Sequence, residues 1–304
     1  MIQAHGVTKR YGAKVAVDEL SFAVKPGVVT GFLGPNGAGK STTIRMIMGL
    51  DAPTSGDVTV NGRRYRDHVA PMREVGSLLE ARAVHTGRSA YHHLLALAAT
   101  HGISKRRVGE VIDLVGLREV ARKRAGGFSL GMGQRLGIAA ALLGDPATLV
   151  LDEPVNGLDP QGILWIRNLL KGLAGEGRTI FVSSHLMSEM ALTAEHLIVV
   201  GKGRLIADTS VKEFTDAASR NSVRVRTPQA AKLRGLLAGP AVVVTSVEDG
   251  VLEVSGMSGT EIGMVACEQR IPLEELTPVR ASLEEAFMEL TEDTLEYRTE
   301  ERAS

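Results

Sequence analysis

Apolar and polar residues alternate over residues 1–33, which is the pattern of half-buried β-strands. Turn residues at 11–12 and 25–27 interrupt the alternation. A helix is predicted to begin near Lys40 and to end at Gly49. A strand pair is then predicted around Asp57–Val60 and Tyr65. Along the sequence, strands are therefore expected both before and after this short helix.

The spacing of apolar residues changes to three and four between Thr86 and about Leu143, which predicts helices. These positions include Leu94, Leu97, Val108, Val111, Ile112 and Leu114. After Pro160, a helix over 163–173 precedes strands at 179–183 and 196–200. Strands that alternate with helices predict a parallel sheet, so residues 86–143 are expected to form a helical insertion in an α/β domain.

This pattern stops around residues 210–220, and a βαββαβ unit is predicted after it. Its segments are Ser222–Thr227, Ala230–Leu237, Ala241–Val247, Val251–Ser255, Thr260–Gln269 and Pro272–Leu276. An amphipathic helix carrying Leu283, Phe287 and Leu290 comes next, and the charged tail Glu292–Ser304 is expected to fray. The length of 304 residues also favours two domains, here 1–215 with a helical subdomain at about 86–143, and an α+β domain at 216–304.

A glycine-rich loop after the apolar run 28–33 matches the pattern G-x-x-x-x-G-K-[ST]. The loop consists of Gly34, Pro35, Asn36, Gly37, Ala38, Gly39, Lys40, Ser41 and Thr42. Glycines let the backbone curl closely around phosphates, with successive N–H groups pointing inward. Lys40 supplies a positive charge at the β- and γ-phosphates, and the Ser41 hydroxyl is placed to bind Mg²⁺. The loop therefore predicts a nucleoside triphosphate site, unless it arose by chance in a chain with 34 glycines.

A second motif argues against chance. The apolar run 147–151 predicts a buried strand that ends in Asp152 and Glu153. Ligands bind at this edge of parallel sheets, so Asp152 is expected to hold Mg²⁺ directly or through water. Glu153 points to the other side of the strand and is expected to polarise an attacking water. The alternative is a pair of surface carboxylates.

The charge balance and the hydropathy limit the partners. Lysine plus arginine and aspartate plus glutamate both number 35, so the chain lacks the basic excess expected of a protein that binds nucleic acid. The first residues contain no apolar segment typical of a signal peptide, and no stretch approaches 18 apolar residues. The chain is therefore expected to be soluble by itself.

Residues 128–135 read Phe-Ser-Leu-Gly-Met-Gly-Gln-Arg and precede the acidic strand by about twenty residues. Here the sequence resembles the ABC ATPases, whose signature is Leu-Ser-Gly-Gly-Gln. Ser129 and Gly131 are retained, whereas Leu130 replaces the first glycine and Met132 the glutamine. The resemblance implies a P-loop NTPase with a RecA-like parallel sheet core, an N-terminal antiparallel β subdomain and a helical subdomain.

Other elements of the family follow in the expected order up to about residue 210. They are Tyr11 at the position that stacks on adenine, Glu80 in place of the Q-loop glutamine, Asp159 in the D-loop and His185 as the switch histidine. The resemblance implies a head-to-tail homodimer or heterodimer of ATPase subunits. Each ATP would lie between the phosphate loop of one subunit and the signature Ser129, Gly131 and Met132 of the other. His185 would contact the γ-phosphate or its water, and Asp159 would connect the two sites.

Three features resemble the exporter branch with bacitracin, lantibiotic and daunorubicin-type subunits: Glu80, the Ser-Leu-Gly-Met signature and the C-terminal extension. Glu80 keeps an oxygen that can face Mg²⁺ or the attacking water, but it adds negative charge. The resemblance implies an ATPase on the cytoplasmic face of the membrane, driving export through a separate permease that docks at about Arg82–Tyr91. Two alternatives stay open: a regulatory or immunity subunit that hardly hydrolyses ATP, and a soluble ABC ATPase acting on ribosomes or DNA.

Overall fold

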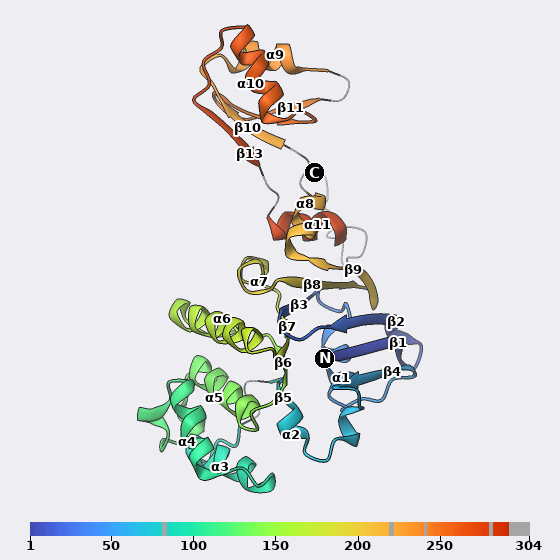
Figure 1. The fold of residues 1–304 in the computed structure, drawn as a ribbon, viewed down its shortest axis with the longest axis vertical. Helices are drawn as coiled ribbons and strands as arrows, with labels where there is room; N and C mark the ends of the chain where they lie inside the picture. The colour runs from blue at the N-terminus through green and yellow to red at the C-terminus, as the bar shows by residue number, and fades with distance from the viewer. Residues whose placement is uncertain (81–83, 219–221, 240–241, 280–281, 292–304) are drawn as a thin grey trace, which may run out of the picture. The chain divides into compact units, whose positions relative to one another are not determined.

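The computed structural model describes residues 1–80, 84–218, 222–239, 242–279 and 282–291. The chain divides into two compact units, residues 1–211 and residues 212–290. The positions of these units relative to each other are not determined (Figure 1).

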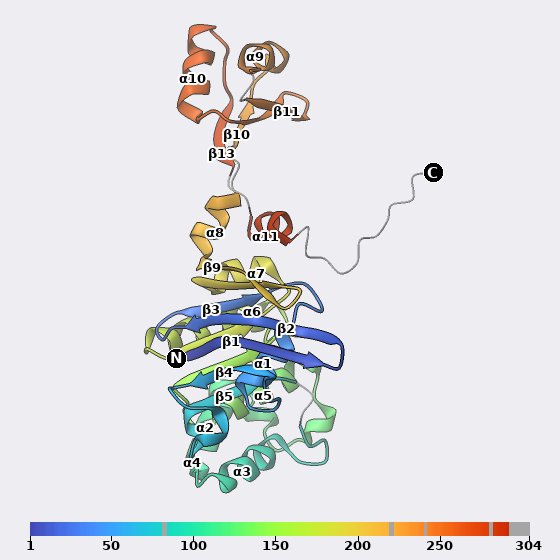
Figure 2. The same cartoon turned by 90° about the vertical axis from the view of Figure 1, so that its right-hand side faces the viewer.

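The first unit contains two sheets (Figures 1 and 2). A three-stranded antiparallel sheet has the order β2-β1-β4, and a six-stranded sheet has the order β5-β6-β7-β3-β8-β9, parallel except for its edge strand β9. The strands are β1 (Ile2–Tyr11), β2 (Lys14–Val24), β3 (Val29–Leu33), β4 (Ser55–Val60), β5 (Val75–Leu78), β6 (Thr148–Asp152), β7 (Thr179–Ser183), β8 (His196–Gly201) and β9 (Arg204–Ser210). All residues of β3 and β7 are buried, as expected for central parallel strands covered on both faces.

Helices of the first unit lie around the six-stranded sheet and in a helical group, one helix of which packs against the edge strand of that sheet. Those near the sheet are α1 (Lys40–Ile47), α2 (Pro71–Glu74), α6 (Pro160–Gly175) and α7 (Met187–Thr193). The predicted helical insertion is confirmed as α3 (Ala90–Thr100), α4 (Lys105–Leu114) and α5 (Leu130–Leu142), with 3₁₀ turns at Arg118–Val120 and Ala125–Gly127. Ser89, Ser104 and Ser129 begin these three helices, and each hydroxyl accepts a hydrogen bond from a backbone N–H of the first turn.

Three phenylalanine rings join the two sheets of the first unit. Phe22 comes from β2 in the antiparallel sheet, whereas Phe32 and Phe181 come from β3 and β7. Their ring centroids are 5.0–5.9 Å apart, within the range of favourable aromatic contacts. The rings belong to one buried cluster that includes residues of both sheets, so the antiparallel sheet is fixed against the parallel one.

The predicted strand at Tyr65 is wrong. Residues Tyr65–Asp67 form a 3₁₀ turn, and after β4 the chain makes only an isolated bridge between Val60 and Arg63. Tyr65 packs against the buried cluster from this turn. Its apolar surface is therefore covered without a strand ladder, which the alternation of residue types does not reveal.

The second unit confirms the predicted βαββαβ order of elements. Its antiparallel sheet has the order β11-β12-β10-β13. The elements are α8 (Val211–Ala218), β10 (Ser222–Arg226), α9 (Ala230–Leu237), β11 (Val243–Glu248), β12 (Val251–Ser255), α10 (Gly259–Glu268), β13 (Glu275–Val279) and α11 (Leu283–Thr291). The last strand begins at Glu275 rather than at the predicted Pro272. The predicted fraying tail 292–304, the side chain of Leu290 and Ala241 lie outside the described residues.

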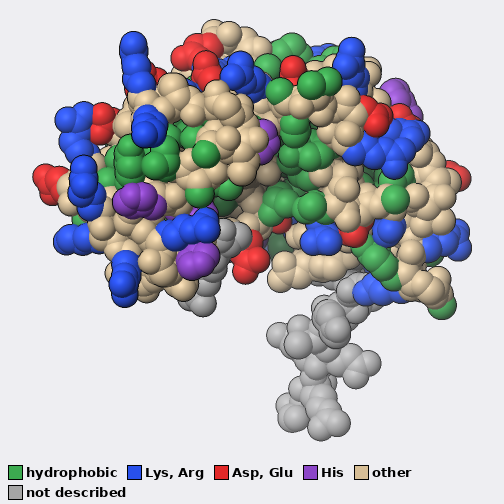
Figure 3. Space-filling model, turned by 90° about the horizontal axis from the view of Figure 1, so that it is seen from below, with side chains coloured by type: hydrophobic (Ala, Val, Ile, Leu, Met, Phe, Trp, Pro, Cys, Tyr) green, Lys and Arg blue, Asp and Glu red, His purple; other side chains and the backbone are tan. Residues whose placement is uncertain are grey.

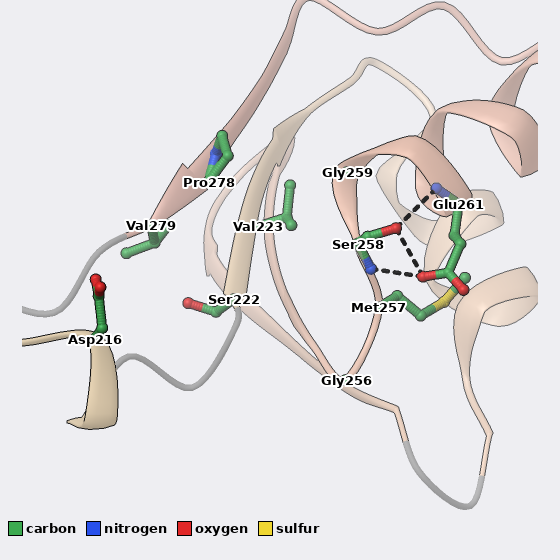
Figure 4. A pocket seen from close by; sticks show the side chains of 10 residues that line it. All are labelled: Asp216, Ser222, Val223, Gly256, Met257, Ser258, Gly259, Glu261, Pro278 and Val279. Carbon is green, nitrogen blue, oxygen red and sulfur yellow. Dashed lines mark hydrogen bonds between the residues drawn. The ribbon is translucent and has the colours of Figure 1, made fainter. Parts of the chain in front are cut away.

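A cavity of about 620 Å³ lies in the second unit, between the N-terminal end of α10 and the neighbouring strands (Figure 4). Glu261 accepts hydrogen bonds from the Ser258 N–H at 2.7 Å and the Ser258 hydroxyl at 2.8 Å. The hydroxyl of Ser222 donates to Glu253 at 2.9 Å. The hydrogen bonds of these polar groups are made to other protein groups and stabilise the local fold.

Among the residues that the structure describes, no helix is long and apolar enough to cross a membrane.

The aromatic contact between the sheets predicts a large effect of Phe181→Ala. Phe181 is fully buried, so we expect the variant to lose about 3–5 kcal/mol of unfolding free energy. The measurement is denaturant unfolding followed by circular dichroism. Val69→Ala is the control because Val69 is 96% exposed, and equal stability of the two variants would contradict the prediction.

Candidate functional site

A cavity of about 530 Å³ lies at the carboxyl ends of β3 and β6, where both predicted nucleotide motifs meet. It is lined by Tyr11, Lys14, Ala16, Pro35, Asn36, Gly37, Ala38, Gly39, Lys40, Ser41, Thr42, Asp152 and Glu153. Strand register explains the meeting. Phe32 of β3 and Asp152 of β6 are both paired with Ser183 of β7, so the segments that follow β3 and β6 leave the sheet at one level.

The glycine-rich loop curls into the first turn of α1. Gly39 precedes the helix with a φ of 98°, a left-handed conformation that glycine adopts without strain. A Cβ at this position would lie 2.5 Å from the carbonyl oxygen of Ala16. Glycine is therefore required both by the backbone conformation and by the approach of β2. The loop leaves the N–H groups at the beginning of α1 available to an anion.

Lys40 lies at the base of the cavity, and its ammonium group donates to the carbonyl oxygens of Gly34 and Pro35, the latter at 3.1 Å. Burial lowers the pKa of Lys40, and the carboxylates of Glu153 and Asp152 partly offset this effect. Gly34 itself does not line the cavity, but its carbonyl orients the lysine. A phosphate group would supply the counter-charge that the buried ammonium favours.

Asp152 is held between two hydroxyl groups. Ser41 donates to one carboxylate oxygen at 3.4 Å, and the buried Ser183 donates to the other. A carboxylate and a hydroxyl on one wall of a cavity are ligands that Mg²⁺ takes in nucleotide sites, where phosphate oxygens and waters complete the shell. The two residues present fit this ion.

Glu153 adopts a left-handed backbone conformation with a φ of 51°, which costs a non-glycine residue about 1–3 kcal/mol. Its N–H donates to the hydroxyl of Ser183 at 3.1 Å, and its carbonyl accepts from the amide of Gln134 at 3.0 Å. One carboxylate oxygen of Glu153 lies 2.7 Å from Nδ1 of His185. His185 does not line the cavity, but this contact connects it to a residue that does.

Tyr11 lies at the rim of the cavity with 49% of its surface exposed. Its hydroxyl donates to Asp51 at 3.0 Å, and the ammonium group of Lys9 lies 5.1 Å from the ring centroid. Burial and the hydrogen bond to Asp51 raise the pKa of Tyr11, so the hydroxyl stays protonated as a donor. These contacts hold the ring at the rim of the cavity.

The remaining predicted residues lie outside this cavity. Ser129 begins α5 and accepts a hydrogen bond from the N–H of Met132 at 3.2 Å, and Gly131 lies between them. Asp159 begins α6 and accepts from the N–H of Gly162. Glu80 is an exposed residue just after β5. Within one subunit, the structure therefore does not bring the signature, the D-loop aspartate or Glu80 into the wall of the cavity.

Four residues at or behind this cavity belong to none of the sequence motifs: Lys14, Ala16, Ser183 and Gln134. Lys14 and Ala16 belong to β2 and reach the cavity only because the two sheets pack together. Ser183 could have been noticed as the polar end of a buried strand. Gln134 could have been noticed as a polar residue among apolar residues on a helix, because a buried amide requires a partner.

Two family models match parts of the chain. A family model described as ABC transporter matches residues 17–156, and a model described as a domain of unknown function (DUF8746) matches residues 221–284.

Two curated proteins and one solved structure are similar to the chain. The uncharacterized ABC transporter ATP-binding protein YhcH of Bacillus subtilis is 37% identical, over 97% of each chain. The bacitracin transport ATP-binding protein BcrA of Bacillus licheniformis is 44% identical over 68% of this chain and 69% of its own length. A dimeric ATP-binding cassette in a post-hydrolysis state, bound to ADP and Pi, is 25% identical with a TM-score of 0.63, covering 69% of this chain and 99% of that one. The chain therefore belongs to the family of ABC transporter ATP-binding proteins.

Proposed function

We propose that the chain is the ATP-hydrolysing subunit of an ABC exporter. One observation carries the proposal: the phosphate loop with Lys40, Asp152 and Glu153 lines one cavity, and Glu153 contacts His185, which lies outside the cavity wall. These groups have the charges that phosphoryl transfer to water requires.

In this proposal the phosphate loop and Lys40 hold the triphosphate by backbone N–H groups and one positive charge. Ser41 and Asp152 would hold Mg²⁺, which would neutralise charge on the phosphate oxygens. Tyr11 stacks on the adenine and orients the nucleotide in the cavity.

Glu153 acts as the general base in this reaction. It accepts a proton from a water whose oxygen attacks the γ-phosphorus, while the bond from that phosphorus to its bridging oxygen breaks. ADP and inorganic phosphate leave, and the proton on Glu153 returns to solvent. His185 orients the carboxylate through its 2.7 Å contact. In the proposal its ring also contacts the γ-phosphate or the attacking water.

The open cavity is completed by a second ATPase subunit, in a homodimer or a heterodimer. Ser129, Gly131 and Met132 lie at the beginning of α5, where the helix dipole favours an anion. Asp159 connects the two sites. In the dimer the γ-phosphate is contacted by both subunits. Its loss on hydrolysis removes this link between the subunits and lets the dimer open.

An integral membrane permease docks on the helical subdomain in this proposal, which places the chain on the cytoplasmic face of the membrane. A hollow of about 310 Å³ is lined by Val84, Thr86, Ala125, Gly126, Phe128, Ser129, Leu130 and Gly133. Thr86 accepts a hydrogen bond from the N–H of Gly126 at 3.1 Å, so this segment is joined to the residues just before α5. The end of the unit that carries α2, α3 and α4 exposes hydrophobic side chains among lysines and arginines (Figure 3). Arg82 of the predicted docking segment lies outside the described residues.

Similarity to a bacitracin transport protein supports an antibiotic, an antimicrobial peptide or a lipid-like compound as the exported substrate. The near-neutral charge of the chain supports a membrane partner rather than nucleic acid. Glu80, exposed after β5, would reach Mg²⁺ or the attacking water only after rearrangement on nucleotide binding.

If Glu153 is the base, its replacement should impair ATP hydrolysis and leave ATP binding intact. We expect Glu153→Gln to bind ATP normally and to lose roughly 100- to 10,000-fold in turnover, because the amide cannot accept the proton. Phosphate release and fluorescent-nucleotide binding measure the two effects. Glu119→Gln is the control, since Glu119 is exposed and outside the cavity wall. Full turnover of Glu153→Gln would remove Glu153 from this role.

Tyr11 offers a test of nucleotide stacking with a matched control. We expect Tyr11→Ala to weaken ATP binding by about 1–3 kcal/mol, because it removes the ring. Tyr11→Phe keeps the ring and loses only the hydroxyl bond to Asp51, so its affinity should stay close to that of the unaltered protein. Equal affinities of all three proteins in equilibrium titration would refute the stacking.

Affinity purification of Glu153→Gln from detergent-solubilised membranes with ATP and Mg²⁺ tests the partner. We expect a multi-helix membrane protein as the main stoichiometric partner in mass spectrometry, because the variant remains in the ATP-bound state. Purification without nucleotide is the control. Ribosomal or DNA-bound partners without a membrane protein would overturn the exporter proposal. Unimpaired ATP binding with negligible steady-state hydrolysis, with and without the permease, would favour a regulatory subunit.

A further inference from the structure

The helix that begins at the signature serine contacts the catalytic loop of its own subunit. The amide of Gln134 on α5 donates to the backbone carbonyl of Glu153 at 3.0 Å. Gln134 is only 2% exposed, so this buried amide is fixed within the protein. The contact joins a helix of the helical subdomain to the loop between β6 and α6.

A second contact joins the same two segments. The Leu130 side chain packs so closely on Gly157 that a Cβ on the glycine would overlap it. A Cβ on Gly131 would lie 2.8 Å from the carbonyl oxygen of Gly157. The beginning of α5 and the side chain of Gln134 therefore hold the loop at two points, Gly157 and Glu153.

Glu153 depends on such support because its backbone is in the left-handed region with a φ of 51°. Ser183 fixes its N–H on one side. On the other side its carbonyl accepts from the amide of Gln134 at 3.0 Å and from the N–H of Asn156 at 3.2 Å. Rotation of this backbone would change the direction of the carboxylate and its 2.7 Å contact with His185. A displacement of α5 that moves the Gln134 amide therefore changes where the carboxylate points.

We infer that Gln134 is a positioning residue that makes the orientation of Glu153 depend on the signature helix of the same subunit. The inference rests on the proposed role of Glu153 as general base. In the proposed dimer, Ser129 at the start of α5 contacts the ATP held by the partner subunit. ATP in one site thereby orients the base of the other site, through the helix between Ser129 and Gln134.

The first test compares Gln134→Met with Ile138→Val. Methionine has a similar length but no donor, whereas Ile138→Val loosens the packing of the same helix without touching the hydrogen bond. We expect Gln134→Met to lose roughly 10- to 100-fold in kcat for ATP, with KM changed by less than about twofold. Ile138→Val should keep both constants. If Gln134→Met does not fold, Gln134→Asn serves instead, because its amide is too short to reach the carbonyl. Unchanged kcat in the folded variant would overturn the inference.

A second test asks whether Gln134→Met acts on Glu153 of the same subunit or on the site of the partner subunit. Two differently tagged copies are co-expressed and purified over both tags, and one copy carries Glu153→Gln, so that only one base remains. We expect Gln134→Met to lower turnover when it is in the copy that keeps Glu153, and to have little effect in the other copy. Loss of turnover from the other copy would show an effect through the signature in trans and would overturn the inference. A fully active Glu153→Gln homodimer would instead refute the proposed base.

Discussion

The register of three parallel strands determines the site. Phe32, Ser183 and Asp152 lie at one level across β3, β7 and β6, and each chain segment leaves the sheet just beyond that level. The phosphate loop and the acidic pair therefore meet although more than one hundred residues separate them in sequence. A shift of any one strand by one residue would turn its side chains to the opposite face and separate the groups. Packing of the buried strands thus also fixes the chemistry.

Ser183 shows how closely the fold and the site are connected. Its single hydroxyl donates to the carboxylate of Asp152 and accepts from the N–H of Glu153. The residue proposed to hold the metal and the residue proposed to take the proton are therefore fixed by one buried group. Gln134 adds a restraint from outside the sheet. The orientation of Glu153 therefore depends on hydrogen bonds from both β7 and α5.

Much of the fold could be predicted from the sequence because its periodicities are local. The buried strands, the helical insertion and the order of elements in the second unit follow from apolar spacing and turn residues. The strand prediction at Tyr65 is wrong because Tyr65 packs against the buried hydrophobic cluster and not beside a strand. Such a tertiary contact cannot be predicted from the local pattern of residues. The members of the phosphate loop and Asp152 were identified because consecutive residues form each motif. Lys14, Ser183 and Gln134 were missed because their roles depend on contacts between distant segments.

The hydrogen bond that begins α5 has a further consequence for the residue types allowed there. Ser129 accepts the N–H of Met132, and its hydroxyl hydrogen remains free to donate in another direction. Aspartate and asparagine begin helices about as well as serine does. A carboxylate, however, offers no hydrogen to a phosphate oxygen and would repel it by charge. Helix formation alone thus tolerates several side chains at this position, whereas the proposed contact with a phosphate would exclude an acidic one.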